Sequence, residues 1–193
     1  MTAVLQLERP YTVEDLANTP DDGRRYEVIG GELVVSPAPS TKHQRVSFRL
    51  SRILGDYLER VGSGEAFAAP IDVVLGTHDI VQPDIVVVLQ KHANRVIDAG
   101  IEGAPDIVIE ITSPSSQRMD RIRKSATYAT FGVPEYWIVD PDTETILVQT
   151  LVDGRYQTGE NREGTVRSIQ LPDLVIETRD VFALPHRSEN PTP

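Results

Sequence analysis

Two acidic side chains lie beside or within stretches of the sequence that otherwise favour burial. Asp84 directly precedes the apolar run 85–89, and Glu110 interrupts the β-branched run 107–111. A buried carboxylate is costly unless a cation or a hydrogen-bond donor compensates it. Two carboxylates on neighbouring strands would suit Mg²⁺, which binds hard oxygen ligands and keeps water or phosphate in its remaining positions. The simpler alternatives are a surface ion pair for Glu110 and a turn at the start of a strand for Asp84.

A basic side chain follows Glu110 along the chain. Asp120, Lys124 and Tyr128 are spaced four residues apart in a stretch, 117–131, that predicts a helix. Residues with this spacing share one face of a helix. Taken alone, the spacing favours an exposed pair between Asp120 and Lys124, which would stabilise the protein by only about 0.3–0.5 kcal/mol.

The elements that position these residues follow from the periodicity of the sequence. Alternation in the run 106–111 places three isoleucines on one face of a strand and Glu110 on the other. Together the elements predict a single α/β (α+β) domain over residues 11–184, with flexible ends at 1–10 and 185–193. Strands are expected at 26–29, 32–35, 71–75, 84–89, 106–111, 135–139 and 145–150, with weaker ones at 155–157 and near 166–175, and helices at about 12–19, 46–61 and 117–131.

Composition and charge exclude several classes of protein. The 193-residue chain has no cysteine and a net charge of −10, with 19 basic against 29 acidic residues. The lack of cysteine excludes disulfides, thiolate metal sites and cysteine nucleophiles. No apolar run is long enough to span a bilayer, and the N-terminus does not resemble a secretory signal. We therefore expect a cytoplasmic protein without a membrane partner.

Positive charge is concentrated in two short windows. Residues 42–52 contain four basic side chains and no acid, and residues 118–124 contain four basic side chains and one acid. A local patch of this kind can contact nucleic-acid phosphates even on an acidic protein. A solvated helix face can look the same. The candidate phosphate contacts are Gln44, Arg45, Arg49, Arg118, Arg121 and Tyr128.

The sequence from Glu110 to Pro141 resembles the Uma-two (Uma2) family of restriction endonuclease-like proteins, a group within the PD-(D/E)xK nuclease superfamily. The resemblance covers about residues 11–182 and implies a mixed β-sheet core flanked by helices, as in restriction endonucleases. It also implies hydrolysis of DNA phosphodiester bonds with Mg²⁺ or Mn²⁺ as the cofactor. The matching motifs are Tyr26-Glu-Val-Ile-Gly-Gly-Glu-Leu33, Ser36-Pro37, His43-Gln44, Pro83-Asp84, Glu110-Ile-Thr-Ser-Pro-Ser-Ser116, Arg118, Asp120, Lys124, Tyr128 and Gly132-Val-Pro-Glu-Tyr-Trp-Ile-Val-Asp-Pro141.

The resemblance implies a role for each site residue. Asp84 and Glu110 would ligate the metal, together with the backbone carbonyl of Ile111. Lys124 would orient the attacking water or offset the charge that develops on phosphorus. Glu27 would add a carboxylate through water or act as a base, unless it is a solvated residue of a hairpin.

One position departs from the superfamily pattern. The pattern Glu-x-Lys would place lysine at Thr112, so Lys124 on the following helix is the natural replacement and must reach back to Glu110. Asp106 also follows a proline and competes with Asp84. The superfamily takes its two acids from adjacent strands, whereas Asp106 lies on the same strand as Glu110, which favours Asp84.

Two other functions remain open. The missing lysine and the net acidity favour a non-catalytic interaction or regulatory module on the same fold. A metal-dependent hydrolase of a small phosphoester would keep the same two carboxylates. If the protein is a nuclease, we expect a homodimer, because two basic windows side by side would form a groove for DNA.

Overall fold

The computed structural model describes residues 8–112, 118–159 and 164–183, and side chains in the first turn of α3 are described only from residue 122 onward. A six-stranded sheet, here called the central sheet, has the order β12-β11-β10-β9-β6-β3. Strands β9 and β10 are parallel, and the other neighbouring pairs are antiparallel. The strands are β3 (Gly64–Ala68), β6 (Ile85–Leu89), β9 (Ile107–Ile111), β10 (Glu135–Asp140), β11 (Thr145–Val152) and β12 (Arg155–Thr158).

A second six-stranded sheet has the order β2-β1-β5-β4-β8-β7, and a two-stranded sheet pairs β13 with β14. Four α-helices and one 3₁₀ helix complete the described residues. The strands are β1 (Arg25–Ile29), β2 (Glu32–Ser36), β4 (Val73–Gly76), β5 (Asp79–Val81), β7 (Val96–Ile97), β8 (Gly100–Glu102), β13 (Thr165–Arg167) and β14 (Val175–Glu177). The helices are α1 (Val13–Leu16), α2 (Thr41–Val61), η1 (Gln90–Arg95), α3 (Arg118–Thr130) and α4 (Thr178–Phe182).

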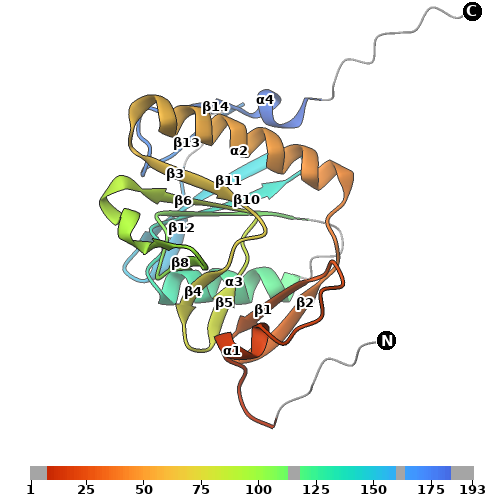
Figure 1. Ribbon diagram of the computed structural model, residues 1–193. Helices are drawn as coiled ribbons and strands as arrows, with labels where there is room; N and C mark the ends of the chain where they lie inside the picture. The colour runs from red at the N-terminus through yellow and green to blue at the C-terminus, as the bar shows by residue number, and fades with distance from the viewer. Residues whose placement is uncertain (1–7, 113–117, 160–163, 184–193) are drawn as a thin grey trace, which may run out of the picture.

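The central sheet is covered on both faces (Figure 1). Helix α2 packs on one face, where Leu50 and Leu54 join Ile85 and Ile109 in one apolar cluster. Helix α3 and the second sheet cover the other face, where a second cluster includes Val108. Because both faces are covered, a carboxylate on β9 is held away from bulk water.

Helix α2 confirms the predicted long helix and begins earlier, at Thr41. Ser40 caps it by accepting a hydrogen bond from the His43 backbone N–H at 3.2 Å. The polar first turn lacks the apolar spacing used for the prediction, which explains the five-residue difference. Gly62 ends the helix in the left-handed conformation, with φ of 63°.

Helix α3 connects the parallel strands β9 and β10, as a parallel pair requires. Gly132 follows it with φ of 77°, and the Val133 N–H donates to the Tyr128 carbonyl at 2.9 Å. This ending matches the predicted stop. The crossover packs one face of α3 against β9, and that face carries Lys124.

Several elements were not predicted. Strand β3, with the sequence Gly-Glu-Ala-Phe-Ala, has little β propensity of its own and is held by five residue pairs with β6. The predicted strand 71–75 is observed as β4, Val73–Gly76, and the weak prediction near 166–175 resolves into β13 and β14. The short strands β5 and β8 also pair with strands distant in the sequence, β1 and β4, whereas within the described chain β7 pairs only with the adjacent β8.

The predicted flexible ends fall mostly outside the described residues, since 1–7 and 184–193 are not described. Near the beginning of the described chain, the Arg9 guanidinium donates to both oxygens of Asp15, at 2.8 and 2.9 Å. No helix within the three described ranges is long and apolar enough to cross a membrane.

Candidate functional site

Asp84 and Glu110 lie opposite each other on neighbouring strands. In the antiparallel pair of β6 and β9, Ile85 faces Ile109. Continuing this register by one residue brings Asp84 opposite Glu110. Alternation then directs both carboxylates toward α3 and the second sheet, the side on which Val108 packs.

Three donors hold the Asp84 carboxylate, which is 2% exposed. Arg25 donates to Oδ1 at 2.9 Å, while Nε2 of His43 and the backbone N–H of Ile111 reach Oδ2 at 3.1 and 2.7 Å. Burial by itself would raise the pKa of Asp84. The hydrogen bond from His43 and the positive charge of Arg25 outweigh burial, so the pKa of Asp84 is lowered and the carboxylate is ionised.

Glu110 is held on one oxygen only. The Lys124 ammonium lies 2.9 Å from Oε1, and the Tyr128 hydroxyl donates to the same atom at 2.6 Å. Within the described part of the chain, no hydrogen bond reaches Oε2. Burial raises the pKa of Glu110, and the nearby charge of Asp84 adds to this effect against the opposing charge of Lys124. Oε2 is therefore the oxygen that can bind a cation.

Lys124 bridges two carboxylates from different sheets. Its ammonium lies 2.8 Å from Oε1 of Glu27 on β1 as well as 2.9 Å from Glu110 on β9. Burial alone would lower the pKa of Lys124, but the two carboxylates raise it, so the amine remains charged. An ammonium has three N–H donors. Two of them point at these carboxylates, and the third can reach water or a phosphate oxygen.

Glu27 is the more enclosed of the two carboxylates that contact Lys124. It is 1% exposed, and its Oε1 also accepts a hydrogen bond from the Gln82 N–H at 2.8 Å. Its Oε2 is buried without a hydrogen-bond partner among the described residues. A buried acceptor in this state favours a water molecule. The alternative of a solvated hairpin residue is therefore wrong for Glu27.

A comparison with protein families decides the relationship of this chain. The sequence model of the Uma2 family, described as "Putative restriction endonuclease", matches residues 13–179. The chain belongs to the Uma2 family. This confirms the resemblance found in the sequence. No curated protein sequence matches the chain significantly.

A solved structure supports the fold of this Uma2 protein. It is described as "a putative nuclease belonging to DUF820" from Anabaena variabilis ATCC 29413, at 1.96 Å resolution. The two chains share 21% sequence identity with a TM-score of 0.75, over 90% of this chain and 98% of the other. The predicted restriction-endonuclease-like fold, a mixed α and β core flanked by helices, is therefore confirmed.

Two residues that contact Asp84 were not predicted as site residues. Arg25 opens β1 and also donates to the Gln82 carbonyl at 3.0 Å, while His43 lies in the first turn of α2. Neither has a sequence spacing that relates it to Asp84. The motif His43-Gln44 in the family resemblance was the only signal for His43.

The structure separates the predicted phosphate contacts. Gln44 is exposed on α2, Arg45 is partly buried beside it, and the Arg49 guanidinium donates to the Ala183 carbonyl. Tyr128 is fully buried, and its hydroxyl is bound to Glu110. Tyr128 was predicted to touch phosphate, but its buried side chain exposes no surface to a phosphate and supports the Glu110 carboxylate from inside. The side chains of Arg118 and Arg121 lie outside the described residues.

Asp106 is not part of the site. It is fully buried at the other end of β9, where its oxygens accept hydrogen bonds from the Leu89 N–H at 2.8 Å and from His92 Nδ1 at 2.9 Å. Lys91 lies 3.4 Å away. These contacts hold η1 against the strand. Asp106 therefore serves the fold, and Asp84 is the acid next to Glu110.

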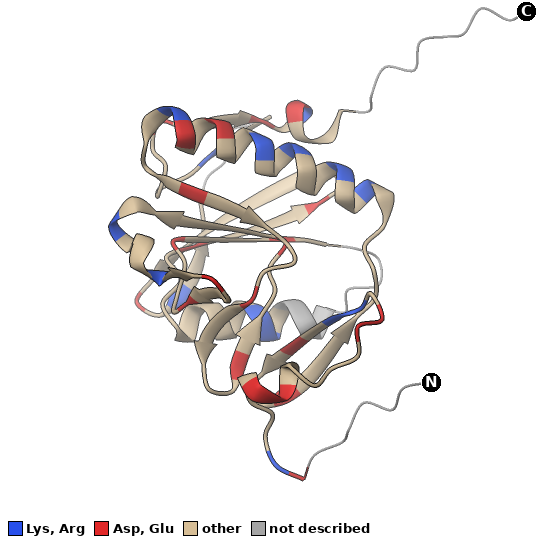
Figure 2. Cartoon of the chain, viewed as in Figure 1, with Lys and Arg blue, Asp and Glu red and all other residues tan. Residues whose placement is uncertain are grey.

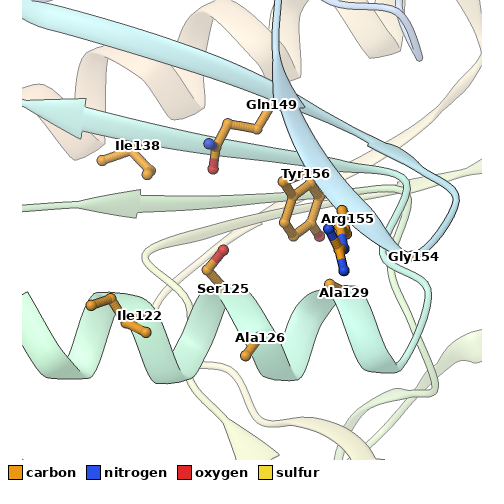
Figure 3. Close-up of a pocket in the computed structure, with 9 residues that line it drawn as sticks. All are labelled: Ile122, Ser125, Ala126, Ala129, Ile138, Gln149, Gly154, Arg155 and Tyr156. Atoms are coloured by element: carbon orange, nitrogen blue, oxygen red, sulfur yellow. The ribbon is translucent and has the colours of Figure 1, made fainter.

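A pocket of about 490 Å³ lies between α3 and strands β10 to β12 (Figure 3). Helix α3 contributes to it a face adjacent to the one that carries Lys124. None of the lining residues is acidic, so the pocket does not offer the carboxylate chemistry found at Asp84 and Glu110. The lining residues are Ile122, Ser125, Ala126, Ala129, Ile138, Gln149, Gly154, Arg155 and Tyr156.

The lowered pKa of Asp84 predicts how stability depends on pH. A group whose pKa is lower in the folded state stabilises the protein above its unfolded pKa and loses this effect as pH falls through the folded value. For Asp84 the loss begins below about 3.8, the ordinary value for aspartate. The difference in free energy of unfolding between wild type and Asp84→Asn, measured in urea without metal, should therefore be constant from pH 7 to 5. It should shrink below pH 3.8, and a difference that grows there would contradict the assignment.

Proposed function

We propose that this protein is a divalent-metal-dependent nuclease that hydrolyses DNA phosphodiester bonds at the pair Asp84 and Glu110. The observation that carries this proposal is the Lys124 ammonium, which lies 2.9 Å from Glu110 although it comes from a separate helix. Two opposed carboxylates with an adjacent buried cation form the arrangement that the sequence could only suggest. The descriptions of the Uma2 family and of the similar solved structure both agree with this chemistry.

The residues of the site fit Mg²⁺ or Mn²⁺. No group of three or more acidic or histidine residues in the described ranges is arranged as a metal cage. Mg²⁺ does not need one, because it commonly binds through one or two carboxylates and keeps its waters or substrate phosphates. Oε2 of Glu110 accepts no hydrogen bond from the described residues, and Asp84 lies opposite. The carbonyl of Ile111 points to the same strand edge as its N–H, which reaches Asp84 at 2.7 Å.

The protein side chains would divide the remaining work. A metal held by Asp84, Glu110 and the Ile111 carbonyl would polarise the phosphoryl oxygen and acidify a bound water. Lys124 would donate its third N–H to that water or to a phosphate oxygen. Glu27, with its buried Oε2, would accept a hydrogen bond or a proton from water at this position.

Arg25 would bind phosphate in the same site. Its guanidinium is partly exposed and is bound to Asp84 at 2.9 Å. If a metal ion also bound Asp84, it would compete with Arg25 for the carboxylate and weaken this ion pair. The guanidinium would then be free for the planar two-oxygen contact that arginine makes with phosphate.

One observation favours a non-catalytic module instead. Both oxygens of Asp84 already accept hydrogen bonds, so this carboxylate could serve only to fix Arg25, His43 and the end of β9 in place. The two functions differ in metal binding. A structural Asp84 would keep its three partners at any concentration of Mn²⁺.

Metal binding and cleavage by the wild-type protein test the proposal together. Calorimetric titration with Mn²⁺ is expected to show a bound ion, and a supercoiled plasmid should be nicked with Mg²⁺ or Mn²⁺ but not with EDTA. Absence of both signals would support the non-catalytic module. Metal binding together with hydrolysis of small phosphoesters, but not of DNA, would support a metal-dependent hydrolase of small phosphoesters. The homodimer remains a prediction, which sedimentation velocity would test.

A further inference from the structure

The outer face of α2 carries an exposed aromatic ring between two arginines. Phe48 is 69% exposed, more than any other large hydrophobic side chain in the described residues. Arg45 lies three residues before it and Arg52 four residues after it, so the three side chains share one helical face. Exposed Gln44 adjoins them.

The side chains of the two arginines have no polar partner among the residues that the structure describes. Lys42 is paired with Asp142 at 2.6 Å, and Arg49 donates to the Ala183 carbonyl. By contrast, no ion pair or hydrogen bond reaches the Arg45 or Arg52 side chain from the described part of the chain. Figure 2 shows basic residues along most of α2. Residues 41–55 contain no acid, although the chain has a net charge of −10.

This combination indicates a particular ligand. A single exposed apolar residue needs no explanation, but a ring flanked by two unpaired guanidinium groups matches the two parts of a nucleotide. Aromatic faces stack on bases, and arginines bind phosphates. In a duplex the base faces are already stacked on one another. An unpaired base can stack on Phe48 without the cost of unstacking a duplex step, so Phe48 favours a single strand.

We propose that the outer face of α2 binds single-stranded nucleic acid, with an unpaired base stacked on Phe48 and the backbone phosphates on Arg45 and Arg52. The proposal rests on the proposed nuclease function, for which it names the class of substrate. Its evidence is separate from the metal site, because none of the three side chains touches Asp84 or Glu110.

The position of this face suits a flexible strand. His43, in the first turn of α2, contacts Asp84 at 3.1 Å. Phe48 and Arg52 lie about 7.5 Å and about 13.5 Å further along the helix axis than His43, at about 1.5 Å per residue. They face solvent, whereas His43 faces the core. A strand bound to Phe48 must therefore bend around the first turn of α2 to reach the carboxylates. Duplex DNA, with a persistence length of about 150 base pairs, resists such a bend.

Fluorescence anisotropy in EDTA tests the proposal without cleavage. The probes are a fluorescein-labelled oligothymidylate and a duplex of the same length. Wild type should bind the oligothymidylate more tightly than the duplex, and Phe48→Ala should weaken that binding about tenfold, because the variant loses the aromatic ring on which a base stacks. Phe48→Trp should restore the binding of the oligothymidylate.

The arginines are tested by the dependence of binding on salt. Replacing Arg45 and Arg52 with glutamine should reduce the slope of the logarithm of the binding constant against the logarithm of the salt concentration by about 1.4, at about 0.7 for each phosphate contact on a single strand.

Ile169→Ala is the matched control, since Ile169 is 61% exposed and lies outside α2, and it should leave binding unchanged. Failure of wild type to bind the oligothymidylate, or equal binding by Phe48→Ala, would overturn the proposal. A wild-type dimer that Phe48→Ala dissociates, with DNA binding unchanged, would assign this face to a second copy instead. Phe48-dependent binding without metal-dependent cleavage would support this inference and refute the nuclease function. Cleavage without Phe48-dependent binding would refute this inference alone.

Discussion

Glu110→Gln is expected to lower metal-dependent cleavage by about a thousandfold, the equivalent of about 4 kcal/mol in the barrier, while the protein stays folded. The amide oxygen can replace Oε1 and accept the hydrogen bonds of Lys124 and Tyr128, which lie at 2.9 and 2.6 Å. The amide NH₂ then lies where Oε2 was. An NH₂ group donates hydrogen bonds and repels a cation, so the variant loses the proposed metal ligand and keeps its internal contacts.

The control for this variant is Glu65→Gln, which makes the same chemical change at an exposed position on β3. Cleavage should be measured as the rate of plasmid nicking with saturating Mn²⁺, and metal binding by calorimetry. Glu65→Gln should match wild type in both. If Glu110→Gln retained wild-type Mn²⁺ affinity and nicking rate, Glu110 would not be a metal ligand.

The parts of this site that the sequence predicted are those encoded locally. Alternation in β9 places Glu110 on the face opposite three isoleucines, and helical spacing places Lys124 and Tyr128 on one face of α3. Both patterns arise from residues close in the chain, for which backbone geometry alone determines direction. Local patterns were not enough to predict the pairing of Asp84 with Glu110, because that prediction depended on choosing Asp84 over Asp106. The choice came from the family resemblance.

The unpredicted parts depend on contacts between distant segments. Arg25 reaches Asp84 across 59 positions of sequence, and β1 becomes a neighbour of the site only because the second sheet folds under the central one. The burial of Lys124 could not be predicted either. Its spacing favoured an exposed pair with Asp120, and only tertiary packing places Glu27 at 2.8 Å from the ammonium. Tertiary contacts of this kind override local preference.

Lys124→Met should strongly destabilise the protein, in addition to reducing cleavage. The side chain of Lys124 is 11% exposed and its ammonium lies within 2.9 Å of two carboxylates. Methionine fills much of the same volume but leaves Glu27 and Glu110 buried without a counter-charge. Breaking a buried ion pair from one side costs about 3–5 kcal/mol, because the remaining charge stays desolvated. Urea unfolding at pH 7 without metal measures the loss.

Lys42→Met provides a matched control for that measurement. Lys42 lies 2.6 Å from Asp142, but both side chains are more than half exposed, so the loss of this pair should cost about 1 kcal/mol or less. The two variants therefore break ion pairs of similar length, one buried and one exposed, so the difference between their losses of stability measures the effect of burial.

The stability of Lys124→Met should also depend on pH. The pKa of Glu110 is already raised by burial, and removal of Lys124 raises it further. A raised carboxyl pKa stabilises the folded state at lower pH, so the deficit of Lys124→Met should shrink from pH 7 to 5. A deficit as small as that of Lys42→Met would contradict the buried ion pair, and a deficit independent of pH would attribute the loss to packing.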